Sequence, residues 1–157
     1  MKSILLIGYG NSTRMDDGVG WYIADKIEEK LNDLVEVMKA DQLAVEMVDD
    51  IKDRDLVILG DAHVSEEDDW IRSEEVKPDP SPGLITHIIK PSNLLAFCES
   101  LYHKHPKAYL YSIKGVYFDF GEELSEQTQK SADEAIQKIA NLVSHIGDHY
   151  KTGANLF

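Results

Sequence analysis

The chain has 157 residues, 43% of them hydrophobic, and a formal net charge of −13 at pH 7. This size suits one domain whose core needs neither disulfides nor a structural metal. The acidic balance excludes nucleic acid and anionic membranes as partners, because both require a basic patch that neutralises phosphate. The apolar N-terminal run is too short for a secretory signal or a bilayer span, so we expect a cytoplasmic protein.

We expect a single domain over residues 1–150 and a flexible C-terminal tail over residues 151–157, because the helical pattern fades after Asp148. The one cysteine, Cys98, falls on a predicted helix beside Leu94 and Leu95. Free cysteines in such settings are usually buried and inert, so we predict a core thiol and not a nucleophile.

Strand-like and helix-like segments alternate along the first part of the chain. Continuous apolar runs are typical of parallel strands covered on both faces, and apolar residues at helical spacing predict the helices between them. The pattern predicts strands over residues 4–7, 34–38 and 56–59, the last ending at Gly60-Asp61, and helices over 19–31 and 42–50. Short connections between such elements imply right-handed crossovers and an open α/β sheet flanked by helices.

An acidic stretch with three prolines, residues 65–83, interrupts this alternation and is expected to be a surface excursion. Within it, Trp70-Ile71-Arg72 is expected to add an edge strand. Regular elements then return: a strand over residues 84–89, a helix opened by Pro91 and running to about Tyr102, a strand over 108–116 and a long helix over 125–149.

The most informative segment is the loop Gly8 to Gly20, which joins a buried strand to a helix and ends in the pair Asp16 and Asp17. Backbone amides at a helix N-terminus favour an anion, but these two carboxylates would repel a phosphate there. The loop therefore favours presenting carboxylate oxygen to a cation or a peptide.

A dinucleotide site is the alternative for this loop. Gly8-Tyr9-Gly10 supplies the first two glycines of a Rossmann fingerprint, and Asp41 follows the second strand where a ribose-binding acid would stand. The third glycine position is Thr13, however, so the pattern is incomplete.

Three polar residues fall at carboxyl ends of predicted strands, where ligands bind in open α/β sheets. They are Asp17, Asp61 and His87. Two carboxylates and one imidazole form a plausible set of ligands for a divalent metal with open positions. His63, two residues beyond Asp61, is the competing imidazole.

Each residue also has a purely structural interpretation. Asp16 or Asp17 can cap the following helix, and for Asp16 we favour that role. Asp61 can accept hydrogen bonds from the next turn, although a carboxylate after four buried aliphatic residues needs a positive or hydrogen-bonding partner. His87 taken alone is more simply a core histidine.

The motif residues are similar to the hydrogenase maturation endopeptidases, which remove a C-terminal peptide from the large-subunit precursor of nickel-iron hydrogenase. The shared pattern comprises Gly8, Gly10, Asn11, Asp16, Asp17, Gly18 and Gly20. The strand ending in Asp61-Ala62, the Thr86-His87 segment and the stretch from Gly115 to Ser125 also resemble the family. In some members the ligating histidine directly follows a proline, where this chain has Ser92.

The resemblance implies a three-layer sandwich, with a mostly parallel central sheet and helices on both faces. It implies a metal site of Asp17, Asp61 and His87, with Asp17 and Asp61 in the catalytic role. It also implies that nickel arrives with the protein substrate, the hydrogenase precursor, and is not a resident cofactor. The alternative of a different class is a non-catalytic metal- or peptide-binding protein of the same fold.

Overall fold

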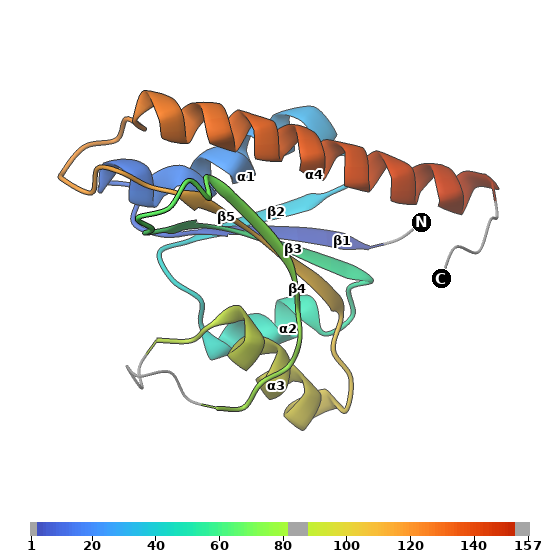
Figure 1. Ribbon diagram of the computed structural model, residues 1–157. Helices are drawn as coiled ribbons and strands as arrows, with labels where there is room; N and C mark the ends of the chain where they lie inside the picture. Colours follow the sequence, from blue (N-terminus) through green and yellow to red (C-terminus); the bar gives the residue numbers. More distant parts are fainter. Residues whose placement is uncertain (1–2, 82–87, 153–157) are drawn as a thin grey trace.

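The computed structural model describes residues 3–81 and 88–152, with residues 147–152 described by their backbone only. Figure 1 shows the arrangement of the elements in space. In chain order these are β1 (Ile4–Tyr9), a 3-10 helix (Met15–Gly18), α1 (Val19–Leu31), β2 (Glu36–Ala40), a 3-10 helix (Val45–Met47), α2 (Val48–Ile51), β3 (Leu56–His63), β4 (Ile71–Val76), α3 (Pro91–Tyr102), β5 (Lys107–Lys114) and α4 (Glu126–Thr152).

The strands form one sheet in the order β2-β1-β3-β5-β4. All neighbouring pairs are parallel except β4 with β5, which is antiparallel. Helices α1 and α4 lie on one face of the sheet, and α2 and α3 lie on the other (Figure 1). The predicted α/β sandwich with a mostly parallel sheet and helices on both faces is confirmed.

The order of the strands reverses between β1 and β3. From β1 the chain crosses to β2 on one side, and β3 then pairs with β1 on the other side. The carboxyl ends of these two strands flank a switch point, which is where open α/β sheets bind their ligands. Tyr9 ends β1 and Asp61 lies near the end of β3, so both side chains are placed at this edge.

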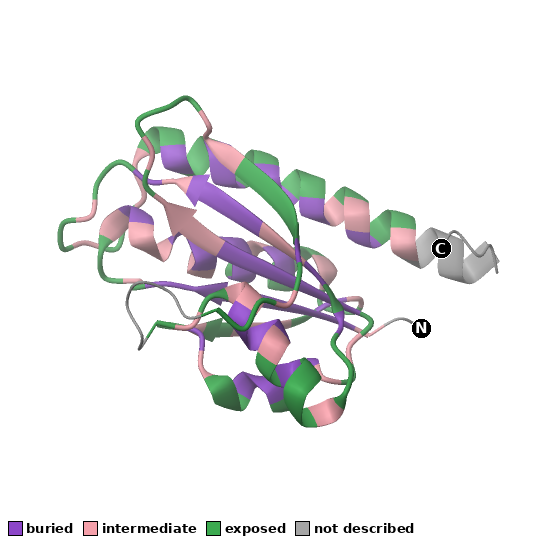
Figure 2. Ribbon diagram, turned by 60° about the horizontal axis from the view of Figure 1, so that its bottom comes forward, coloured by how far each residue is buried: buried purple, intermediate pink, exposed green. Residues whose placement is uncertain are grey.

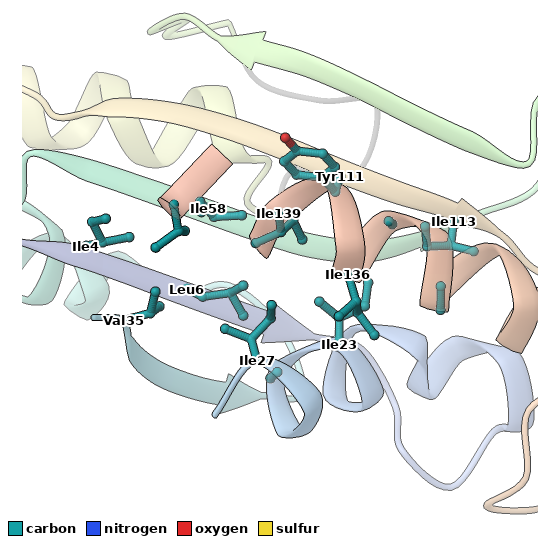
Figure 3. Close-up of a cluster of buried hydrophobic side chains, with 14 of the residues drawn as sticks. Ile4, Leu6, Ile23, Ile27, Val35, Ile58, Tyr111, Ile113, Ile136 and Ile139 are labelled. Carbon is teal, nitrogen blue, oxygen red and sulfur yellow. The ribbon is translucent and has the colours of Figure 1, made fainter. Parts of the chain in front are cut away.

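Alternate residues of the central strands supply two separate cores, one for each face of the sheet. Leu6 and Ile58 pack with Ile23 of α1 and Ile136 of α4, and all four are essentially inaccessible to solvent (Figure 3). The opposite core includes Cys98 of α3, whose predicted burial is confirmed. Figure 2 shows that burial is concentrated in the strands and in the inward faces of the helices.

Some predicted boundaries were displaced, for local reasons. The β2 strand starts at Glu36 because the amides of Leu34 and Val35 bond to the Leu31 carbonyl and close the end of α1. The β3 strand continues to His63 because β5 pairs with it along its whole length. Asp61 is therefore inside the strand and does not follow it.

In the second half of the chain some predicted elements are present and others are not. The edge strand predicted in the acidic excursion is present as β4, and α3 begins at Pro91 and ends at Tyr102, as predicted. Of the strand predicted over residues 84–89, Ile88 and Ile89 are in no strand, and residues 84–87 lie outside the described residues. In the described part of the chain, no helix is both long and apolar enough to cross a bilayer.

Helix α1 approaches the sheet closely through Gly20. A Cβ atom at this position would lie 2.5 Å from the Gly60 carbonyl oxygen and 2.6 Å from the Tyr9 carbonyl oxygen. Both neighbours are backbone atoms, which cannot move without shifting β1 and β3. The absence of a side chain at Gly20 therefore sets how α1 sits over the two strands that bear the site.

Gly20→Ala is expected to lower the free energy of unfolding by about 2–3 kcal/mol or more, because the added methyl group displaces backbone in a packed interface. Chemical denaturation measures the change. The matched control is Glu28→Ala at an exposed position of the same helix, which should change stability very little. Equal stability of Gly20→Ala and the wild type would contradict the close packing.

Candidate functional site

Several backbone amides of the glycine loop after β1 donate hydrogen bonds to other groups of the protein. The Asn11 amide donates to Asp17 Oδ2 at 2.8 Å, and the Thr13 amide donates to Asn11 Oδ1 at 3.0 Å. The Met15 amide donates to the Gly121 carbonyl at 2.8 Å, and the Asp17 amide donates to the Arg14 carbonyl at 3.1 Å. A phosphate cradle needs free amides, so this geometry disfavours the dinucleotide alternative.

Gly10 permits the loop to close over Asp17. Its φ of 138° lies in the region that favours glycine, and a Cβ atom there would be 2.2 Å from the Asp17 carbonyl oxygen. The indole Nε1 of Trp21 donates to the carbonyls of Gly10 and Ala40, at 2.9 and 3.1 Å, and ties the loop to the end of β2. The backbone that carries Asp17 is thus fixed from two sides.

Asp61 is held in a polar setting at the end of β3. Its Oδ1 accepts a hydrogen bond from the Ala62 amide at 2.7 Å, and it also accepts one from the Tyr9 hydroxyl. Burial raises the pKa of Asp61 to about 6, although the bonds from Ala62 and Tyr9 oppose the rise. The negative charge of Asp17 raises this pKa further. Burial, followed by the Asp61 charge, raises the pKa of Tyr9 as well.

The two predicted carboxylates are therefore close enough to interact electrostatically across the switch point. The Asp17 charge disfavours ionisation of the partly buried Asp61, and a cation bound near both carboxylates would offset that effect. The arrangement suits an incoming positive group, such as a divalent metal or a cationic side chain.

The third predicted ligand, His87, lies outside the described residues. Among residues 3–81 and 88–146, no group of three or more His, Cys, Asp and Glu side chains is arranged to hold a metal ion. Before this gap in the described residues, the carbonyls of Asp79 and Ser81 accept hydrogen bonds from Nδ2 of Asn93 in α3, at 2.9 and 3.0 Å.

The competing imidazole, His63, already has partners on both ring nitrogens. Its Nδ1 bonds to the Ser112 hydroxyl, and its Nε2 lies 3.0 Å from the Asp69 carbonyl oxygen. Burial lowers the pKa of His63, and its side chain is only 9% exposed. A metal would have to displace one of these partners, so the geometry disfavours His63 as a ligand.

The helix-capping role favoured for Asp16 is wrong. The N-cap position of α1 is Gly18, and no side chain caps that helix. Asp16 is instead completely buried, and its carboxylate joins the loop after β5 to the start of α4. It accepts hydrogen bonds from the amides of Val116, Tyr117 and Ser125, at 2.8, 3.0 and 2.7 Å, and from the hydroxyls of Ser125 and Thr128, at 2.8 and 3.1 Å.

These donors make Asp16 a fixed anion and not a proton carrier. Burial alone would raise its pKa, but the amides of Ser125, Tyr117 and Val116 outweigh burial and lower it below the ordinary value. Sequence reasoning missed this role, and it missed the hydrogen bond from Tyr9 to Asp61. The available signal for Tyr9 was its position at the end of β1, beside the strand that bears Asp61.

Asp61→Asn is expected to raise the melting temperature by a few degrees above pH 6 and to have little effect below pH 4. Because the pKa of Asp61 is raised from 3.8 to about 6 in the folded protein, its contribution to stability is lost as the pH rises through 6. The amide variant carries no such charge. Thermal unfolding across this pH range, with Asp68→Asn as the exposed control, measures this change in melting temperature. A rise in melting temperature that does not depend on pH would contradict the expectation.

Asp16→Asn is expected to destabilise the fold by about 2–3 kcal/mol, because the amide nitrogen would face backbone donors in a buried site. The folded-state pKa of Asp16 is lowered, so the loss should be present at neutral pH and should shrink as the wild type itself is protonated in acid. Denaturant unfolding measures this loss against Asp119→Asn, an exposed position in the loop after β5. A change no larger than that of the control would refute the anchoring role.

Comparison with known proteins identifies relatives by sequence and by structure. No protein-family model matches the chain. Hydrogenase 2 maturation protease from Escherichia coli strain K12 is 33% identical over 98 residues, which cover 58% of this chain and 57% of that protein. The match therefore spans little more than half the length of the curated relative.

The folds agree over a greater length. Hydrogenase maturating endopeptidase HybD from E. coli superimposes with a TM-score of 0.74 at 22% identity, covering 92% of this chain and 94% of that one. The [NiFe] hydrogenase maturation protease HycI from Thermococcus kodakarensis gives 0.71 at 21% identity, covering 91% and 93%. The chain is thus similar to hydrogenase maturation proteases in sequence over 98 residues and in fold over about nine tenths of its length.

Proposed function

We propose that this protein is an endopeptidase that removes a C-terminal peptide from the precursor of a nickel-iron hydrogenase large subunit. The observation that carries the proposal is the like-charged pair Asp17 and Asp61 at the switch point of the sheet. The curated relative is described as a hydrogenase maturation protease, and its matched region includes a little over half of this chain.

In this proposal the nickel belongs to the substrate. Carboxylate oxygens of Asp17 and Asp61, together with an imidazole nitrogen of His87, would meet the nickel already seated in the precursor. Such a set leaves coordination positions for ligands that the precursor itself supplies. The nickel would supply Lewis acidity near the scissile carbonyl.

The residues of the chain supply the proton chemistry of hydrolysis. Water adds to the carbonyl carbon, a proton passes to a carboxylate, and the leaving amine takes a proton as the peptide bond breaks. Asp61 suits the role of base, because a pKa of about 6 keeps it ionised at neutral pH yet able to hold a proton. The Tyr9 hydroxyl donates to this carboxylate and orients it.

The specific alternative is a non-catalytic binding protein. The observation that favours it is Ser92, which stands where some family members carry the ligating histidine. A binder of this kind would hold the nickel-loaded precursor without shortening it. Incubation of the wild type with that precursor, followed by intact mass spectrometry, separates the two functions by the presence or absence of a mass loss.

Asp17→Asn and Asp61→Asn are each expected to abolish processing of the nickel-loaded precursor, because each removes a charge that the nickel would meet. Neither substitution should lower the melting temperature. His87→Ala should lower processing strongly and His63→Ala only weakly. The same mass assay follows all four variants. Cleavage at the wild-type rate by both aspartate variants would reject the mechanism, and a greater loss with His63→Ala would reassign the imidazole.

A further inference from the structure

Four large apolar side chains are exposed together at the carboxyl edge of the sheet. They are Val64 after β3 and Val116, Tyr117 and Phe120 after β5, with exposed fractions of 76%, 45%, 55% and 80%. We call these residues the apolar patch. The Gly115 amide donates to the His63 carbonyl at 2.9 Å, so Val64 and Val116 leave the sheet from adjacent strands.

The backbone under the patch is firmly held. Asp16 accepts from the amides of Val116 and Tyr117, and the Asp16 amide donates to the Tyr117 carbonyl at 3.0 Å. The Gly121 amide donates to the Thr13 carbonyl at 2.9 Å. A loop fixed by a buried carboxylate has no need to expose aromatic side chains for its own folding. Exposed apolar groups on a rigid backbone are typical of interaction surfaces.

The patch adjoins the candidate site. Asp16, which accepts hydrogen bonds from the backbone of the patch, immediately precedes Asp17 of the candidate site. Figure 1 shows the connection from β5 to α4 at the same end of the molecule as the start of α1. A polypeptide that lies across the patch therefore reaches the paired carboxylates without crossing the rest of the surface.

The segments that carry the apolar patch are rich in acidic residues. Between Lys114 and Lys130 the sequence carries no basic residue, and Asp119, Glu122 and Glu123 are exposed in that stretch. Three further exposed acids, Glu66, Glu67 and Asp68, follow Val64. A cation also contacts the patch: the Arg14 guanidinium lies 4.2 Å from the centre of the Phe120 ring. The surface favours an apolar segment that also carries lysine or arginine.

We propose that the apolar patch docks the C-terminal extension of the hydrogenase precursor, a segment with apolar side chains and positive charge. The inference rests on the proposed function, because it is the substrate tail that must enter the site. Aromatic side chains at the centre of such a surface supply most of its binding energy. The acidic residues around them orient the incoming segment and raise its rate of association.

The test measures the Kd of the nickel-loaded precursor by fluorescence anisotropy and the KM of its processing. Tyr117→Ser combined with Phe120→Ser should weaken both by about tenfold and leave kcat within about twofold, since the patch binds substrate but takes no part in the chemistry. The matched control combines Phe97→Ser with Leu101→Ser on α3, which are 42% and 59% exposed, and should change neither constant.

Two further arms identify the occupant. Processed large subunit without its extension should bind about tenfold more weakly to the wild type than the precursor does. Glu122→Lys combined with Glu123→Lys should weaken binding and reduce its dependence on salt. Unchanged affinity of the aromatic double variant, or equal affinity of the processed and unprocessed subunits, overturns the proposal.

The outcomes distinguish this inference from the proposed function. If the wild type binds the precursor but does not cleave it, the protease function fails while the docking comparison still stands on Kd alone. If the wild type cleaves and the double variant keeps both constants, the docking surface fails while the protease function stands. If the wild type does not bind the precursor at all, both fail.

Discussion

The burial of the Asp61 carboxylate near the negative charge of Asp17 is the constraint on which the candidate site depends. Burial raises the pKa of Asp61 in β3, and the charge of Asp17, in the 3-10 helix before α1, raises it further. A fold tolerates such a pair when the rest of the structure enforces it and when a ligand relieves it. The same repulsion that costs stability without a ligand becomes affinity for a positively charged group.

Backbone packing and a buried anion enforce this placement. Gly20 lets α1 press against β1 and β3, so the helix start that follows Asp17 is fixed relative to the strand that bears Asp61. Asp16 locks the adjacent turn to the loop after β5 and to the first turn of α4. The two neighbouring aspartates thus differ: the Asp16 carboxylate accepts five hydrogen bonds, whereas Asp17 Oδ2 accepts one from the Asn11 amide.

The sequence predicted the sheet and its helices well because apolar runs and helical spacing are local signals. The prediction that Asp17 and Asp61 stand at strand ends was less accurate, since Asp61 lies within β3 and Asp17 in the 3-10 helix before α1. The sequence did not predict the role of Asp16, whose donors lie about a hundred positions away, from Val116 to Thr128. Nor did it predict that β3 would extend past Asp61, because that length depends on pairing with β5. Non-local hydrogen bonds leave little trace in local patterns.

The most direct test of the account is nickel K-edge X-ray absorption on a precursor altered at its scissile residue so that it cannot be cut. Adding the wild-type protein is expected to introduce new oxygen ligands into the first coordination shell of the nickel. A variant combining Asp17→Asn with Asp61→Asn is expected to introduce none. A first shell that stays the same when the wild-type protein binds would contradict the claim that these two carboxylates meet the metal.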